Sequence, residues 1–196
     1  MIIFRSLRTN LLSQGFGKEN TFPALLVSYQ KYGLLGHNGW DWSAQDKEPI
    51  YWDTDGRGTV IKTSIDSSGG LGIVIASEDN GKHYKHRFWH LKEFKCQTGQ
   101  IVESGELLGW ANNTGFSTGT HLHRDLKECD KDGKTLNKDN GYGGCISPEL
   151  YFKNVFILNY LDALRTQISI LKRMLEIIKK IISLRLEIKF KNDKNL

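Results

Sequence analysis

The chain lacks the features by which many small proteins are classified from sequence. Its three cysteines, Cys96, Cys129 and Cys145, form an odd set without C-x-x-C spacing, so they predict neither a disulfide framework nor a zinc knuckle. Reduced thiols are the favoured interpretation, with a Cys129 to Cys145 bridge as the alternative in an oxidising compartment. The glycine-rich loop from Asn113 to Gly119 is not followed by Gly-Lys-Ser or Gly-Lys-Thr, which excludes a phosphate-binding loop there.

Long apolar runs are missing as well. No stretch of 18 or more consecutive apolar residues occurs in the sequence, so we expect no membrane-spanning helix. The apolar start of the chain meets Arg5 and Arg8 before an apolar segment of sufficient length has formed, and we expect no signal peptide. Export of the chain would therefore need another route.

The excess of positive charge is confined to one part of the chain. With 196 residues, of which 39% are hydrophobic and 25% charged, one soluble domain with an appendage is the expected organisation. Residues 1–153 contain 18 Lys and Arg against 18 Asp and Glu, whereas residues 154–196 contain nine against four. Because the net charge of +5 comes entirely from the second segment, we expect no nucleic-acid partner.

Residues 1–153 have the pattern of an all-β domain. Short apolar or alternating runs are separated by clusters of Gly, Asn, Asp and Ser, which favour turns. Many short strands of this kind predict an antiparallel sandwich or a small barrel. The segment from Thr98 to Gly109 is similar to the hairpin of a barrel-sandwich hybrid. Ser147 and Pro148 predict the start of a helix. Strands are expected at residues 60–65, 72–77, 84–91, 100–102, 106–110 and 121–127.

Residues 154–196 change to a helical period. Apolar residues recur at alternating spacings of four and three from Ile157 to Ile182, which is typical of a coiled-coil seam. A second apolar stripe widens this face, and Lys and Arg side chains occupy the opposite face. The segment is therefore predicted to be a basic amphipathic helix. Self-association or packing against the domain is the favoured role, and binding to an anionic membrane surface is the alternative.

The most informative residues are two histidines one position apart, His121 and His123. Alternate residues of a strand point to the same face, so the two imidazoles would lie side by side. Upstream, His37 and Asp41 lie four residues apart in a segment whose glycines favour a loop. A catalytic zinc ion takes three protein ligands and leaves a fourth position for water. His37, Asp41 and one of the paired histidines are therefore candidate ligands, and the spacing does not decide which one. His90, in a run of strand-forming aromatic residues, is a candidate acid or base.

Four segments carry a resemblance to a known family. They are Gly-His-Asn-Gly-Trp-Asp, Trp-His-Leu, Gly-Gln-Ile-Val-Glu-Ser-Gly-Glu-Leu-Leu-Gly and Asn-Thr-Gly-Phe-Ser-Thr-Gly-Thr-His-Leu-His. In this order they resemble the lysostaphin-type (LytM-like) zinc endopeptidases, which cleave peptidoglycan, over roughly Gln14 to Phe152. The resemblance implies an antiparallel β-sandwich or barrel-sandwich hybrid, the duplicated hybrid motif fold. We expect this peptidase domain at residues 1–153 and the amphipathic helix at residues 154–196.

The resemblance also implies roles for individual residues. It makes His37, Asp41 and His123 the zinc ligands and gives His121 and His90 the acid and base roles. The implied function is a zinc-dependent metalloendopeptidase that hydrolyses peptide bonds in peptidoglycan stem peptides or cross-bridges. Zinc-bound water would be the nucleophile, and histidine would assist by proton transfer. The alternative is a non-catalytic cell-wall-binding or regulatory member of the same fold, but such relatives typically lose zinc ligands. The expected place of action is the bacterial cell wall.

Three positions do not follow from the resemblance. Arg124 stands where family members usually carry an aromatic or other apolar residue. If His121 and His123 face the groove, Arg124 faces the other side of the sheet, and either packing or a salt bridge with a carboxylate is expected there. His83 and His86 match no family segment and are expected to be solvated. The loop from Asn113 to Gly119 is expected to form a wall of the groove.

Overall fold

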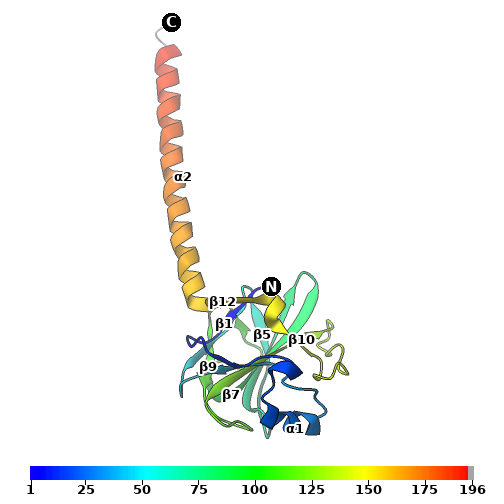
Figure 1. Cartoon of the computed structure of the whole chain (residues 1–196). Coiled ribbons are helices and arrows are strands. Elements are labelled where there is room, and N and C mark those ends of the chain that lie inside the picture. Colours follow the sequence, from blue (N-terminus) through cyan, green and yellow to red (C-terminus); the bar gives the residue numbers. More distant parts are fainter. Residues whose placement is uncertain (194–196) are drawn as a thin grey trace. The chain divides into compact units, whose positions relative to one another are not determined.

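The structure of the chain, a computed structural model, describes residues 1–193, with side chains described as far as residue 186. The chain divides into two units, one from Met1 to Ile157 and one that begins at Leu158. Strands dominate the first unit, and one long helix, α2 (Ile157–Asp193), makes up the described part of the second (Figure 1). The prediction of a mainly β fold with a C-terminal helix is confirmed.

The first unit contains one large antiparallel sheet and one separate pair of strands. Its strands are β1 (Ile3–Arg5), β2 (Leu12–Gln14), β3 (Trp40–Ser43), β4 (Pro49–Tyr51), β5 (Gly58–Asp66), β6 (Gly70–Asp79), β7 (Lys82–Phe94), β8 (Ile101–Val102), β9 (Leu107–Ala111), β10 (His121–Cys129), β11 (Cys145–Ile146) and β12 (Phe152–Phe156). The main path of the sheet runs β2-β3-β10-β7-β6-β5-β8, with β9 on β7, β4 on β9 and β11 on β10. β1 and β12 pair in parallel. Strands β10 and β7 thus lie at the centre of the sheet.

The six predicted strands correspond to β5 through β10. The sequence pattern did not reveal the short strands β1 to β4, β11 and β12, or the helix α1 (Pro23–Lys31) between β2 and β3. Ser147 does cap a helix by accepting a hydrogen bond from the backbone N–H of Glu149, but this 3-10 helix ends at Tyr151. It is short because Phe152 continues directly into β12.

Alternate side chains of the central strands divide between a core and a groove. The core contains fully buried apolar residues such as Trp52, Ile73 and Phe88. In β10, Leu122 and Leu126 belong to buried clusters, whereas His121 and His123 lie on the other face. The period of two along the strand therefore separates residues that build the fold from residues that face solvent.

The boundary between the two units differs from the prediction. A boundary after residue 153 would cut β12, which pairs with β1, and the structure separates the units after Ile157. The helix predicted for residues 154–196 begins at Ile157, and residues 194–196 of that range lie outside the described residues. No helix in the described part of the chain is long and apolar enough to cross a membrane.

Candidate metal centre and groove

The three predicted ligands come from different parts of the sheet and meet at one point. Asp41 of β3 lies directly opposite His123 of β10 in the antiparallel register. His37 precedes β3 and is fully buried, and its backbone forms an isolated bridge with Gly17. Gly39 allows the close approach, because a Cβ at this position would lie 2.7 Å from Cε1 of His123. His37, Asp41 and His123 therefore form a cluster that could hold a metal ion.

The separations within this cluster fit a zinc ion. The Nε2 atom of His37 lies 3.1 Å from Nδ1 of His123 and 3.2 Å from Oδ1 of Asp41. The Nδ1 atom of His123 lies 2.8 Å from the same carboxylate oxygen. Tetrahedral ligands at zinc bond lengths of about 2.05 Å are separated from one another by about 3.3 Å. The three donor atoms are therefore close to the spacing that zinc requires.

Further contacts orient the two histidine rings. The Nδ1 atom of His37 lies 2.8 Å from the carbonyl oxygen of Gly15, so a proton on Nδ1 leaves the lone pair of Nε2 for a metal. The Nε2 atom of His123 lies 3.4 Å from Oδ2 of Asp125. The other oxygen of Asp125 accepts a hydrogen bond of 2.7 Å from Nε of Arg87. Each ring therefore has a partner for one nitrogen and directs the other into the cluster.

The charges of the cluster follow from these contacts. Burial opposes ionisation of Asp41, but hydrogen bonds with His123 and His37 hold its pKa well below the usual value. Burial likewise opposes ionisation of Asp125, and Arg87 and His123 nevertheless lower its pKa. Burial would lower the pKa of His123, yet Asp125 and Asp41 raise it to about 9. A metal must displace this proton, so metal binding should release a proton and weaken at low pH.

His121 and His90 lie beside the cluster and are not members of it. The Nδ1 atom of His121 lies 2.8 Å from the carbonyl oxygen of Gly119, and its Nε2 atom lies 3.6 Å from Oδ1 of Asp41. The Nδ1 atom of His90 lies 2.7 Å from the carbonyl oxygen of Thr114. The two rings are 4.5 Å apart, centroid to centroid. Burial and the neighbouring His121 lower the pKa of His90 to about 4, so its ring is neutral at pH 7.

A strained backbone brings His90 to this site. Regular alternation along β7 would put His90 on the same face as His86 and Phe88, which are buried in the core. His90 instead has a φ of 65°, and the pairing of β7 with its neighbours shifts register at Leu91. A histidine in the left-handed region is uncommon and strained. The local conformation thus turns the ring towards His121 and His123.

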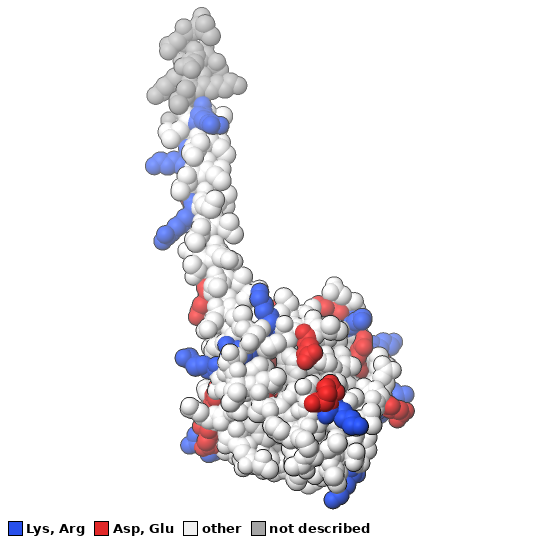
Figure 2. Space-filling view, in the orientation of Figure 1, with Lys and Arg blue, Asp and Glu red and all other residues white. Residues whose placement is uncertain are grey.

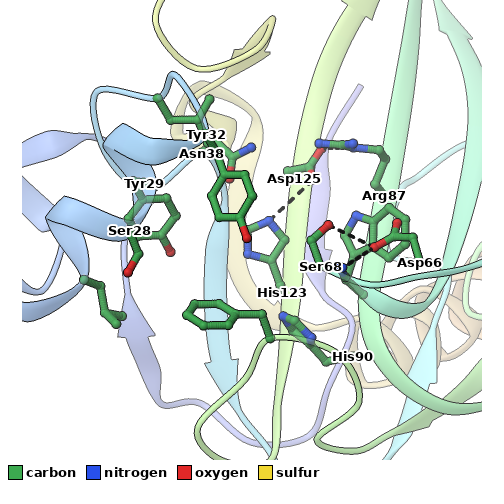
Figure 3. Close-up of a pocket in the computed structure, with 15 residues that line it drawn as sticks. Ser28, Tyr29, Tyr32, Asn38, Asp66, Ser68, Arg87, His90, His123 and Asp125 are labelled. Carbon is green, nitrogen blue, oxygen red and sulfur yellow. Dashed lines mark hydrogen bonds and ion pairs between the residues drawn. The ribbon is translucent and has the colours of Figure 1, made fainter.

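A groove passes over the cluster. Two hollows on it share Leu25, Tyr29, His90, Phe116 and His123 as lining residues. In Figure 3, Tyr29 and Tyr32 of the α1 region lie on one side of His123, and Asp66, Ser68 and Arg87 lie on the other. Phe116 belongs to the loop from Asn113 to Gly119, which lines the groove as predicted. Asp41 and His123 line the groove, whereas His37 is fully buried.

Sequence reasoning missed Tyr29 as a residue of the site. Its hydroxyl accepts a hydrogen bond of 3.1 Å from Nε2 of Gln14, and its ring lies 5.7 Å from that of His37. Burial, together with the charge of Asp41, raises the pKa of Tyr29, so the hydroxyl keeps its proton. It can therefore donate a hydrogen bond into the groove. The sequence signal, one tyrosine ahead of His37, is not specific enough to find it.

On the other face of β10, Arg124 forms a buried salt bridge. Its Nε and Nη2 atoms donate to the carboxylate of Asp53 at 2.6 and 3.1 Å. Nη2 also lies 2.9 Å from Nδ1 of His86, whose Nε2 lies 2.8 Å from Oγ of Ser77. The expectation that His86 is solvated is wrong, because this ring is fully buried as the acceptor for Arg124. His83 is different, with 33% of its side chain exposed.

The three cysteines take no part in the metal cluster. Cys96, Cys129 and Cys145 are buried free thiols, so Cys129 and Cys145 do not form a bridge in this structure. Burial is the main cause that raises the pKa of each thiol, to about 11 for Cys96 and about 12 for Cys145. All three are therefore protonated and unreactive near neutral pH.

Comparison with protein families gives a match for residues 35–138 to the family described as "Peptidase family M23". This span covers more than half of the chain and contains all five histidine and aspartate residues of the site. The chain belongs to peptidase family M23. Assignment to this family confirms the lysostaphin-type resemblance seen in the sequence.

The M23 relatives include "Peptidoglycan DD-endopeptidase ShyA" of Vibrio cholerae, which is 37% identical over 90 residues. The match covers 46% of this chain and 20% of the relative. "Glycyl-glycine endopeptidase ALE-1" of Staphylococcus capitis is 30% identical over 87 residues, which cover 44% of this chain and 23% of the relative. The chain thus matches less than a quarter of the length of these curated relatives.

Solved structures of other proteins have a similar fold. A zinc-containing peptidase from Vibrio cholerae is 26% identical, with a TM-score of 0.52 over 68% of this chain and 38% of that chain. Lysostaphin from Staphylococcus simulans is 20% identical, with a TM-score of 0.53 over 72% of this chain and 49% of that chain. At this identity, the lysostaphin likeness concerns the fold alone.

Proposed function

We propose that the first unit of this M23 protein is a zinc-dependent metalloendopeptidase that hydrolyses peptide bonds in peptidoglycan stem peptides or cross-bridges. One observation carries the proposal: the donor atoms of His37, Asp41 and His123 converge beside a groove that Asp41 and His123 line, with two more histidines next to them. The names of the relatives, a DD-endopeptidase and a glycyl-glycine endopeptidase, support peptidoglycan as the substrate. The bacterial cell wall is then the place of action.

In this proposal, His37, Asp41 and His123 hold the zinc ion. Zinc bound there would polarise the scissile carbonyl and lower the pKa of a water molecule. His90 and His121 each direct one ring nitrogen to a backbone carbonyl, so the other nitrogen is available for proton transfer. A neutral imidazole accepts a proton during attack, and a protonated imidazole donates one to the leaving amine. Hollows on both sides of the ligands accommodate substrate residues before and after the scissile bond.

The decisive experiment separates metal ligands from acid and base residues. His123→Ala should lose zinc, as measured by metal analysis after dialysis. His121→Ala and His90→Ala should keep zinc but lose peptidoglycan hydrolysis by a factor on the order of 10² or more. His83→Ala is a matched control, because its side chain lies partly exposed on β7.

Three outcomes would contradict parts of the proposal. Full zinc occupancy in His123→Ala would refute the ligand assignment, and unchanged turnover in His121→Ala or His90→Ala would remove that residue from the mechanism.

Cell walls of different cross-bridge chemistry, tested with and without a chelator, identify the bond that is cleaved. A zinc-loaded chain that degrades none of them would support the non-catalytic alternative, a wall-binding member of the family.

A further inference from the structure

Helix α2 presents an exposed apolar surface. Its large apolar side chains between residues 168 and 186 are each 46–63% exposed. They are Ile168, Ile170, Leu171, Met174, Leu175, Ile177, Ile178, Ile181, Ile182, Leu184 and Leu186. Helices of soluble proteins normally bury such a face. A contiguous exposed apolar surface of this extent marks a binding surface for another body.

The width of this face distinguishes between possible occupants. At about 100° of rotation per residue, these side chains occupy a continuous arc of about 200° around the helix. Two-stranded coiled coils bury a narrower seam of two positions in every seven. Among the described side chains of residues 168–186, one charged residue, Arg185, lies inside this arc and near its middle. In Figure 2, most blue side chains of α2 project from one side of the helix, and the other visible side is mostly white.

The positions of the charges identify the chemistry of the occupant. Lys172 and Lys179 lie within about 40° of one edge of the apolar arc, and Arg173 and Lys180 lie equally close to the other edge. Glu176 lies at the middle of the polar arc, where it accepts a hydrogen bond from Lys179. Both edges are therefore basic, and the acidic group is farthest from the apolar face. Long basic side chains at such edges can bury their methylene groups and extend the charge towards phosphate groups.

We propose that α2 lies flat on an anionic phospholipid surface, with its apolar arc at the level of the acyl chains and its basic edges at the phosphates. This arrangement is that of interfacial amphipathic helices, which bind by apolar burial together with attraction to anionic lipid. It agrees with the finding that no described helix can cross a membrane. The proposal is independent of the peptidase activity, because every group of the metal centre belongs to the first unit.

A second copy of the chain fits this surface less well. The spacings of four and three along the helix would allow coiled-coil pairing. However, association through the same arc would bring basic edges next to basic edges, and like charges in such positions are destabilising. Among the described side chains of residues 168–186, the only acidic residue is Glu176, which lies away from both edges. A phosphate-rich surface supplies the missing negative charge.

Vesicle flotation of the full chain tests the proposal. We expect binding to vesicles that contain phosphatidylglycerol, weak binding to pure phosphatidylcholine, and a decrease with added salt. The variant Lys172→Gln/Arg173→Gln/Lys179→Gln/Lys180→Gln should partition on the order of 10²- to 10³-fold less strongly, since each basic residue near the surface contributes about fivefold. Lys95→Gln/Lys131→Gln/Lys134→Gln/Lys138→Gln is the matched control, because it removes four exposed charges from the first unit.

The dependence of binding on the lipid charge and on the basic residues of α2 decides the outcome. Equal binding of the two quadruple variants, or equal binding to charged and neutral vesicles, would overturn the proposal, as would no binding by the natural chain. Sedimentation velocity without lipid tests the alternative, which is self-association of the chain through α2. A stable oligomer that fails to float with vesicles would assign the apolar arc to a second copy of the chain. Circular dichroism of both variants shows whether the helix is retained, so that a loss of binding reflects charge.

Discussion

The two faces of strand β10 use the same kinds of residue for opposite purposes. On the groove face, Nδ1 of His123 meets Asp41 and Nε2 of His37, and Asp125 contacts the other nitrogen of the same ring. On the core face, Arg124 is matched by Asp53 and His86, all three fully or almost fully buried. In the first cluster the donor atoms of three side chains converge on one point, whereas in the second a buried cation is paired with a buried carboxylate.

This difference gives a criterion for distinguishing a site from a structural network. Histidine and aspartate in a buried position do not by themselves indicate chemistry, because His86 and Asp53 are as buried as any ligand. What distinguishes His37, Asp41 and His123 is that their donor atoms converge, and that two of the three residues, Asp41 and His123, line a groove. Variants on each face of β10 can test whether the two clusters have separate roles, one in stability and one in metal binding.

The largest effect is expected on the core face. Arg124→Leu should lower the free energy of unfolding by about 3–5 kcal/mol, because it leaves the carboxylate of Asp53 buried without its cation. The double variant Asp53→Leu/Arg124→Leu should recover much of the loss, since apolar residues can replace a buried ion pair. Urea unfolding measures both. The control is Arg57→Leu, at an exposed position close to Asp53 in the sequence. It should change the free energy of unfolding by only about 0.5 kcal/mol. A double variant that is no more stable than Arg124→Leu would contradict this account.

An intermediate effect is expected on the groove face. Asp125→Asn removes the charge that faces Nε2 of His123 and should weaken zinc binding about 10-fold to 100-fold, because partners of ligating histidines orient the ring and raise its basicity. Competition with a chromophoric chelator measures the affinity. Asp132→Asn, in an exposed loop, is the matched control. An affinity equal to that of the control would mean that Asp125 serves the fold alone.

The smallest effect is a dependence of stability on pH that comes from the core face. Burial, and then the charge of Arg124, lower the pKa of His86 well below 6.5. The unfolded chain takes up a proton below about pH 6.5 and the folded chain does not, so stability decreases as the pH falls. His86→Gln should reduce this slope by up to about 1.4 kcal/mol per pH unit between about pH 6.5 and 5. Urea unfolding at several pH values, with His83→Gln as the control for loss of an imidazole, tests it. Equal slopes in natural and His86→Gln chains would contradict the prediction.

The sequence predicted those parts of the molecule that depend on local pattern. Alternation and turn residues located the long strands β5 to β7 and β10, and the change to a helical period located α2. The i and i+2 positions of His121 and His123 placed both rings on the groove side. The same rule placed Arg124 on the core face, and of the two alternatives that it left open there, packing or a salt bridge, the structure shows the salt bridge.

Other features depend on contacts between distant residues, and local pattern does not contain them. The identity of Asp53 as the partner of Arg124, 71 positions away, comes from the packing of the folded chain. The burial of His86 follows from that pair and could not be seen in β7 alone. The short strands β1 to β4 carry too few residues to show a period. The resemblance, and not the spacing, implied His123 rather than His121 as the proposed ligand, and the register that places His123 opposite Asp41 supports this assignment.

The left-handed backbone at His90 sets stability against activity. Holding a residue other than glycine in this region costs on the order of 1–3 kcal/mol, and glycine would relieve it. In the proposed function, however, this position must carry an imidazole beside His121. Selection for a more durable fold and selection for hydrolysis would therefore favour different residues at position 90. If the proposed function holds, the imidazole of His90 is retained at a cost in the stability of this strand.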